Sequence, residues 1–242
     1  MPSKQEKTKQ KWANKFLGKI ISSILILPIV MWLWPWAVPF RFFELWESRG
    51  TISEWLYTAW PIFVWGSGFT LFFALRTRND RKTNRHAEDI LKGGTLISIV
   101  AGVMEEMTFR WLFFLDNIVS VKLTNFFIFG FLGFGIPEWL HLRLVGPIVN
   151  EITLHGLEPY LFHPTGWAVG AAMVTTNAFF RDGHKYQGIF GWINSWFGGM
   201  FLFYIMFTYG IVAAIVVHFV YDFLIFFVRY LDAAFERARG YA

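Results

Sequence analysis

Two long stretches without a charged side chain constrain the fold of this chain most strongly. Residues 20–40 and residues 55–75 each supply 21 consecutive uncharged positions that are rich in apolar side chains. A helix needs about 20 such residues to cross the roughly 30 Å of hydrocarbon in a bilayer. Charged residues make up 16% of the chain, which is low against the roughly 25% of ordinary soluble domains. The sequence therefore predicts an integral membrane protein.

Further apolar stretches extend this pattern toward the C-terminus. Residues 95–115 and 165–180 are each long enough for most of a crossing, whereas residues 123–137 suit a re-entrant or tilted half-helix. Residues 186–228 contain only two ionisable side chains in 43 positions, which is enough for two spans divided near Gly210. We expect an all-α polytopic transmembrane bundle of about six to seven spans, with a re-entrant or interfacial insertion.

The basic residues set the expected orientation. Residues 4–19 carry six lysines and one glutamate, and residues 76–92 form a basic linker. Cytoplasmic loops of membrane proteins carry the excess of Lys and Arg, so we expect a cytoplasmic N-terminus. Six spans would also place the basic C-terminus inside. The net charge of +5 favours anionic lipid as a partner, and no basic face with base-stacking aromatics predicts nucleic-acid binding.

The first span contains prolines, and Pro35 predicts a kink or an early end of that helix. The expected location is a prokaryotic plasma membrane or another internal membrane. The chain has no cysteine, which excludes thiol catalysis and thiolate metal sites.

A charged cluster interrupts the third apolar stretch. Glu105, Glu106 and Arg110 all fall within residues 95–115. A charged side chain at membrane depth costs at least ~2.5–3.5 kcal/mol and usually marks a functional site. Glu106 and Arg110 are four positions apart, so on an α-helix they share one face, and Glu105 is offset by ~100°. A purely structural Glu–Arg pair is the simpler alternative.

Histidines in the later stretches complete the set of candidate residues. His218 and Asp222 are four apart in an apolar stretch, and His184 follows Phe180 by the same interval. A carboxylate beside an imidazole fixes its tautomer and raises its basicity. Antiparallel spans can bring these groups and the glutamates to one cavity. The alternatives are a solvated turn for His184 and a structural hydrogen bond between His218 and Asp222.

Four other histidines lie in connecting segments, and we expect them to be surface residues: His86, His141, His155 and His163.

Three motifs in apolar segments carry a resemblance to a known family. They are Glu105-Glu106-x-x-x-Arg110, Phe180-x-x-x-His184 and His218-x-x-x-Asp222. In this order they resemble the CPBP superfamily, which contains the CAAX prenyl endopeptidases and the bacteriocin-processing or Abi-type membrane proteins. The resemblance covers residues 95–227 and implies an intramembrane glutamate-type endopeptidase acting on a membrane peptide or protein.

The resemblance also implies roles for four catalytic residues. Glu105 would activate the attacking water and His184 would hold that water. His218 and Asp222 would stabilise the oxyanion. An ionised Asp222 cannot donate a hydrogen bond, so it could instead orient His218 or act in its protonated form.

Three residues would support this site. Glu106 and Arg110 would brace it, and Phe180 would shape it. Residues 123–164 form an insertion relative to the usual compact core of the family, and could be a substrate gate or a docking site for a partner membrane protein.

These motifs divide the chain into four expected segments. Residues 1–16 form a basic cytoplasmic tail, and residues 17–94 form two transmembrane helices and a basic linker. Residues 95–231 form a CPBP-like catalytic core, and residues 232–242 form a C-terminal tail.

Two alternative functions use the same residues. The first is a zinc-dependent intramembrane peptidase with Glu105, His184, His218 and Asp222 as ligands, whereas the leading interpretation needs no cofactor. The second is a membrane scaffold or assembly factor that keeps the fold without turnover. Prenylated CAAX peptides, leader peptides and other membrane proteins are equally open as substrates.

Overall fold

The computed structural model describes residues 4–76, 87–163 and 166–238. Helix accounts for 85% of the structure, and the described part of the chain contains no strand. The prediction of an all-α protein is confirmed. Most of the basic linker and His86 lie outside the described residues, so the predictions made for them stay predictions.

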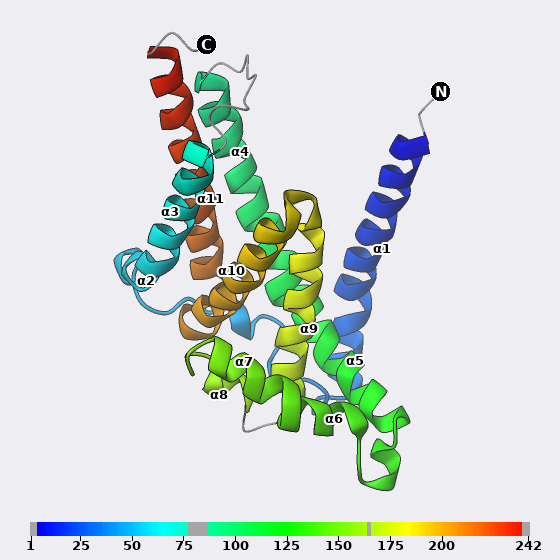
Figure 1. The fold of residues 1–242 in the computed structure, drawn as a ribbon. Helices are drawn as coiled ribbons and strands as arrows, with labels where there is room; N and C mark the ends of the chain where they lie inside the picture. The colour runs from blue at the N-terminus through cyan, green and yellow to red at the C-terminus, as the bar shows by residue number, and fades with distance from the viewer. Residues whose placement is uncertain (1–3, 77–86, 164–165, 239–242) are drawn as a thin grey trace. The chain divides into compact units, whose positions relative to one another are not determined.

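Eleven α-helices occur in the described ranges, and Figure 1 shows them in order along the chain. They are α1 (Lys4–Leu33), α2 (Ile52–Thr58), α3 (Trp60–Arg76), α4 (Ala87–Glu105), α5 (Phe113–Phe127), α6 (Ile136–Leu140), α7 (Gly146–Ile152), α8 (Glu158–Leu161), α9 (Ala168–Gly183), α10 (Gly188–Tyr209) and α11 (Ile211–Ala238). Short 3₁₀ turns lie at η1 (Glu44–Trp46), η4 (Gly130–Leu132) and η6 (Lys185–Gln187), and π-helical segments lie at η3 (Glu106–Leu112) and η5 (His141–Val145).

These helices form two compact units, each assembled from two pieces of the chain. The first unit comprises Met1–Leu45 and Met107–Met200, and the second comprises Trp46–Glu106 and Phe201–Ala242. The four segments predicted from the sequence follow one another along the chain and do not correspond to these two units. They stay a prediction.

Helix α11 is the centre of the second unit, where α4, α3 and α2 pack against it (Figure 1). Gly102 of α4 lies against the backbone of α11, where a Cβ atom would lie 3.1 Å from the Ile215 carbonyl and 3.2 Å from the Phe219 nitrogen. Backbones can approach this closely only where a small residue lies at the interface. Gly102 therefore holds α4 against α11 three residues before Glu105.

A glycine also divides α10 from α11. Gly210 has a φ of +97°, a conformation that a residue with a Cβ atom rarely adopts, and its backbone lies against that of Glu47. The Arg49 N–H donates a hydrogen bond to the Tyr209 carbonyl at 2.9 Å, and the Tyr209 and Thr58 hydroxyls lie 2.8 Å apart. The turn at Gly210 is thus fixed by contacts with residues 47–58, which are far away in the sequence.

The first unit has α9 packed along α5. Asn117 of α5 donates hydrogen bonds to the Phe113 carbonyl at 2.8 Å and to the Thr176 hydroxyl of α9 at 2.9 Å. All of these polar atoms are buried, so the two helices are joined by a satisfied polar contact within an apolar interior.

Within the ranges that the structure describes, two helices are long and apolar enough to cross a membrane by themselves, Lys185–Tyr209 and Ile211–Ala238. The pair Ile52–Thr58 and Trp60–Leu75 would add a third span if its 55° bend lies within one crossing. These helices indicate a membrane protein, and the predicted division of residues 186–228 near Gly210 is confirmed. The total of six to seven spans is not established by them.

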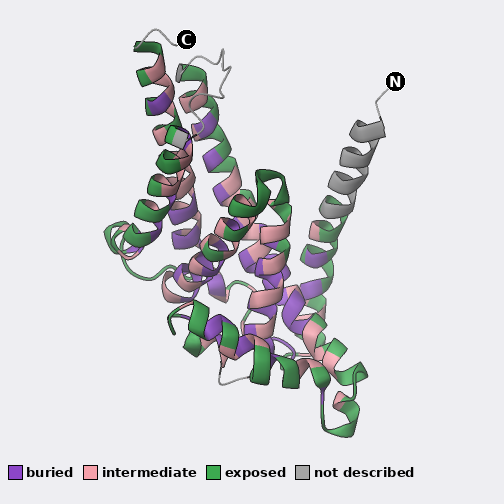
Figure 2. Cartoon of the chain, viewed as in Figure 1, coloured by how far each residue is buried: buried purple, intermediate pink, exposed green. Residues whose placement is uncertain are grey.

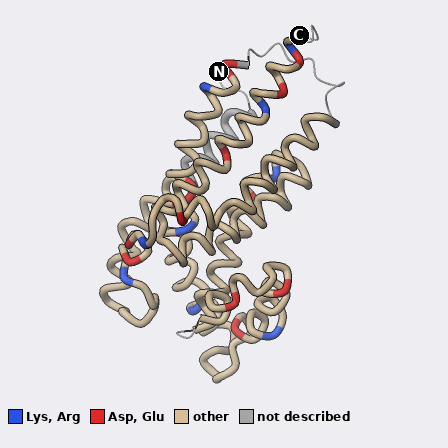
Figure 3. Tube along the Cα trace, turned by 90° about the vertical axis from the view of Figure 1, so that its left-hand side faces the viewer, with Lys and Arg blue, Asp and Glu red and all other residues tan. Residues whose placement is uncertain are grey.

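The outer surface agrees with an apolar environment. Figure 3 shows long parts of the trace without a charged residue, and Figure 2 shows exposed residues along most helices. Trp32, Leu33 and Trp36 are among the exposed large side chains near the end of α1. Helix α1 ends at Leu33, so the early end predicted from Pro35 is confirmed.

The stretch 123–137 is not one helix. It contains the end of α5, a left-handed residue at Phe129 (φ 65°), the turn η4 and the start of α6. Its two ends are joined by Asn125, whose Oδ1 accepts a hydrogen bond from the Glu138 N–H at 3.0 Å. Whether this fold-back enters a membrane stays a prediction.

Candidate active site

Helices α4 and α11 bring four of the predicted site residues together in the second unit. Glu105 and Glu106 lie at the end of α4 and the start of the π-helical segment, and His218 and Asp222 lie on α11. The predicted meeting of the glutamate pair with a histidine from a distant helix is present in the structure.

Glu106 makes the shortest contact in this group. Its Oε1 lies 2.7 Å from His218 Nδ1, and both side chains are buried. A carboxylate oxygen accepts, so the imidazole donates its Nδ1–H in this bond. The bond fixes the ring orientation and directs Nε2 away from Glu106.

The other imidazole nitrogen faces two carboxylates. His218 Nε2 lies 3.6 Å from Asp222 Oδ2 and 3.9 Å from Glu105 Oε2. The side chains of Glu105 and Asp222 are 30% and 24% exposed, against 6% for His218. The Nε2 side of the ring therefore faces the two partly exposed side chains of the group, although Glu105 Oε2 itself is buried.

This arrangement has a simple proton requirement. A deprotonated Nε2 and two ionised carboxylates can only accept hydrogen bonds. The His218 imidazole and the carboxylates of Glu105 and Asp222 can therefore attract one another only if at least one proton or a bridging water lies among them. The group can thus hold a water molecule and exchange a proton with it, which is the first requirement of general acid–base catalysis.

The other three predicted residues lie in the first unit and contact one another. The Arg110 guanidinium lies 4.0 Å from the centre of the Phe180 ring, and the Phe180 and His184 rings are 4.7 Å apart. His184 caps the end of α9 and is partly exposed. The placement of these three side chains relative to Glu105 stays a prediction.

His184 has a defined tautomer. Its Nδ1 lies 2.8 Å from the Phe180 carbonyl oxygen, which can only accept, so Nδ1 carries the proton. In the neutral ring Nε2 is then the acceptor, as a residue that holds an attacking water requires.

The segment of the glutamate motif differs from an ordinary α-helix. Glu106–Leu112 is a π-helix, and the prediction that Glu106 and Arg110 share one face stays a prediction. A π-helix bonds residue i to residue i+5 and so widens the turn. Such segments inside α-helices often lie at functional sites.

The sequence interpretation did not single out Asn177, which is buried in the first unit. Its Nδ2 donates a hydrogen bond to the Trp196 carbonyl at 2.8 Å. A Cβ atom on Gly199 would strike the Asn177 carboxamide oxygen and would lie 3.0 Å from Arg110 Nη2. The sequence signal that could have identified Asn177 is a polar amide in an apolar stretch, three positions before Phe180.

The prediction that His141 is a surface residue is wrong. It is 3% exposed, and its Nε2–H donates to the Leu161 carbonyl at 3.1 Å. Burial lowers the pKa of His141, so the ring is held neutral.

The other two described histidines of these segments differ from His141. The prediction for His155 is confirmed, because its side chain is 56% exposed between Glu151 and Glu158. His163 is partly buried, and burial lowers its pKa.

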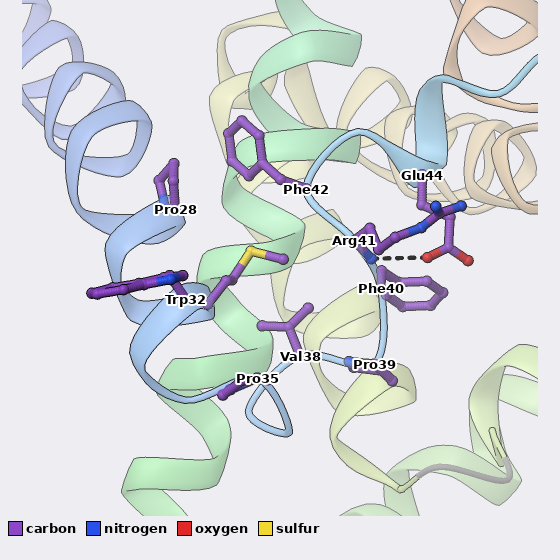
Figure 4. A pocket seen from close by; sticks show the side chains of 10 residues that line it. Pro28, Trp32, Pro35, Val38, Pro39, Phe40, Arg41, Phe42 and Glu44 are labelled. Carbon is purple, nitrogen blue, oxygen red and sulfur yellow. Dashed lines mark hydrogen bonds between the residues drawn. The ribbon is translucent and has the colours of Figure 1, made fainter.

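A separate open pocket of about 490 Å³ lies at the end of α1 (Figure 4). Apolar side chains dominate its lining, with Trp32, Val38 and Phe42 among them. Arg41 donates its backbone N–H to Glu44 Oε2 at 2.8 Å across one edge. None of the predicted site residues lines this pocket.

Among the residues that the structure describes, no group of three or more His, Cys, Asp or Glu side chains is arranged to hold a metal ion. Comparison of the sequence with models of protein families, with curated proteins and with solved structures finds no match. The resemblance to the CPBP superfamily therefore depends on the three motifs alone.

Proposed function

We propose that this protein is an intramembrane endopeptidase that hydrolyses a peptide bond of a membrane-associated peptide or protein. The observation that carries the proposal is the contact of partly exposed Glu105 and Asp222 with the buried Glu106–His218 pair. Three carboxylates around one imidazole are costly to bury in a largely apolar chain, and such groups mark functional sites in membrane proteins.

Glu105 is the proposed general base. It takes a proton from a water molecule, and the oxygen of that water attacks the substrate carbonyl. The tetrahedral intermediate then expels the amine, which receives the proton. His184 holds the water through Nε2, and its bond to the Phe180 carbonyl supports this role.

His218 is the proposed partner of the oxyanion. Glu106 fixes the ring through Nδ1, so the Nε2–H of a doubly protonated ring can donate to the developing charge. Asp222 stabilises that protonated ring, or in its own protonated form donates directly to the oxyanion.

The proposed topology has six spans with the N-terminus in the cytoplasm. The basic N-terminal and linker segments support this orientation, and α10 and α11 supply two of the spans. The membrane is a prokaryotic plasma membrane or another internal membrane, and anionic lipid binds the basic segments.

Cleavage of candidate membrane peptides by the purified protein in proteoliposomes tests the proposal. The variants Glu105→Ala, His184→Ala and His218→Ala should each lose activity by about 10²–10⁴-fold. Glu88→Ala is a matched control, because Glu88 lies on the same helix with a side chain that is 76% exposed. Equal cleavage by the wild type and the three site variants would remove the enzyme proposal.

The same assay distinguishes a metal-dependent reaction. Full activity in chelator is expected for glutamate-activated water. Loss in chelator and recovery with zinc would show instead that zinc supplies the Lewis acid, with ligands from Glu105, His184, His218 and Asp222.

A scaffold without turnover is the second candidate function. Large apolar side chains are exposed along the fold-back that follows α5, and exposed apolar patches are typical of interaction sites. The most exposed of them are Phe127, Phe131, Phe134 and Trp139. A stable stoichiometric complex with a membrane protein, and full cellular function after Glu105→Gln, would support this candidate.

A further inference from the structure

The Asp182 carboxylate binds donors from three different residues at the end of α9. Lys185 Nζ donates to Oδ2 at 2.8 Å, and the Trp192 indole Nε1–H donates to Oδ1 at 2.9 Å. The Arg181 guanidinium donates from Nε to Oδ1 at 3.0 Å, with Nη2 at 2.9 Å from the same oxygen. One carboxylate thus joins the last turn of α9, the turn η6 and the first turns of α10.

A stacking contact strengthens the same connection. The Arg181 guanidinium lies 4.1 Å from the centre of the Trp192 ring. An exposed ion pair alone contributes little, because both side chains must be ordered and water screens the charges. An indole bond and a cation–π contact are directional, so together they fix Trp192 against the end of α9.

His184 lies between the residues that Asp182 binds. Its backbone N–H donates to the Arg181 carbonyl at 2.9 Å, and its carbonyl accepts from the Gln187 N–H at 3.0 Å. The chain then turns sharply at Gly188, where φ is +78°. Asp182 precedes His184 in the sequence, and Lys185 and Trp192 follow it. The hydrogen bonds of Asp182 to these two residues therefore fix the backbone on both sides of His184.

The charge of this carboxylate persists at neutral pH. Hydrogen bonds from Lys185 and Trp192, with Arg181 adding its charge, lower the pKa of Asp182 to about 2. The connection is therefore present at neutral pH.

We infer that Asp182 is a positioning residue for His184, acting through Lys185 and Trp192 rather than on the substrate. This inference rests on the proposed peptidase function for its effect on rate. Its structural part, the position and tautomer of the His184 ring, can be tested without activity.

The test uses the full chain in detergent micelles, with ¹⁵N-labelled His and Trp. The resonances of His184 and Trp192 are identified from the His184→Ala and Trp192→Phe variants. Asp182→Asn should shift the Trp192 indole and the His184 imidazole signals, and Asp182→Glu should restore both toward the wild-type positions. Glu151→Gln is the control, since it removes an exposed carboxylate of the same unit, whose Oε1 lies 3.5 Å from His155 Nε2.

Cleavage assays complete the experiment. Asp182→Asn should lower the rate by between about tenfold and a hundredfold and alter its pH profile, because a small misplacement of a catalytic group is costly. Unchanged His184 signals in Asp182→Asn would overturn the inference even if the rate fell. Absence of cleavage by the wild type would overturn the proposed function, whereas the resonance shifts would still decide the positioning role.

Discussion

Nδ1 of His218 lies 2.7 Å from Oε1 of Glu106, although 112 positions of the chain separate the two residues. Both side chains are buried, and they come from different helical segments of the second unit. The bond joins α11 to the end of α4 and fixes the imidazole for contact with Glu105 and Asp222. It therefore contributes both to the fold of this unit and to its proposed chemistry.

Removal of the buried carboxylate should destabilise the protein. Glu106→Ala leaves the His218 Nδ1–H without its acceptor, and an orphaned buried donor costs roughly 1–3 kcal/mol, or more for a charged partner. Thermal unfolding in detergent measures this loss, and Glu106→Gln should lose less because its amide oxygen still accepts. The expectation fails if Glu106→Ala melts at the temperature of the exposed-site variant Glu88→Ala.

Substitutions of Asp222 separate its two possible tasks. An asparagine donates a hydrogen bond, so Asp222→Asn should retain activity if the task is to stabilise the oxyanion, whereas Asp222→Ala should lose about 10²–10³-fold in rate. The rate constant at saturating substrate is the quantity to measure. Equal inactivity of both variants would show that a proton or a charge on the Asp222 carboxylate is needed instead.

The close approach at Gly102 is a further target. Gly102→Val would insert a branched side chain against the backbone of Ile215 and Phe219, where a Cβ atom already meets atoms at 3.1–3.2 Å. Overpacking of this kind typically costs about 1–3 kcal/mol. It should also separate Glu105 from His218 and lower activity.

A second glycine of α4 provides the control for that substitution. Gly93 has no atom within 4 Å of a Cβ position, so Gly93→Val should leave both stability and cleavage near wild type. Similar melting temperatures for the two valine variants would contradict the packing described for α4 and α11.

His141 should make the stability of the protein depend on pH. Burial lowers its pKa in the folded state below the ordinary value of 6.5, so the unfolded chain binds more protons as the pH falls below that value. The contribution of this histidine to stability is therefore complete above about pH 6.5 and is lost progressively at lower pH.

Melting temperatures between pH 7.5 and pH 5 would reveal that dependence. His141→Gln keeps a donor for the Leu161 carbonyl but cannot titrate, so its melting temperature should fall less on acidification than that of the wild type. His155→Gln is the matched control, because His155 is exposed. Identical acid sensitivity of the wild type and His141→Gln would refute the role of His141.

The sequence predicts some of these features because they follow from simple physical constraints. Long uncharged stretches predict helices, and Gly210 predicts the division of the last apolar stretch because glycine alone readily adopts its backbone conformation. Ionisable side chains in separate apolar stretches are expected to contact one another, since unpaired charges at membrane depth are costly. The meeting of Glu105 and Glu106 with His218 follows from this rule.

Other features depend on contacts that no local pattern records. His141 lies in a stretch of mixed composition, and its ring is buried among Leu161, Phe162 and Trp167, which are distant in the sequence. A π-helical turn differs from an α-helical one by its hydrogen bonds rather than by its composition, so Glu106–Leu112 reads as ordinary α-helix in the sequence. The Asp182 contacts join residues ten positions apart across a turn, and periodicity does not predict them.

The second unit is made of Trp46–Glu106 and Phe201–Ala242, and this interrupted arrangement has a consequence for synthesis. When α4 leaves the ribosome, the helix that carries His218 has not yet been translated. At about 5–20 residues per second, the delay before that partner emerges is on the order of ten seconds. During this interval Glu105 and Glu106 have no imidazole to contact, so this group of side chains can form only after α11 has been translated.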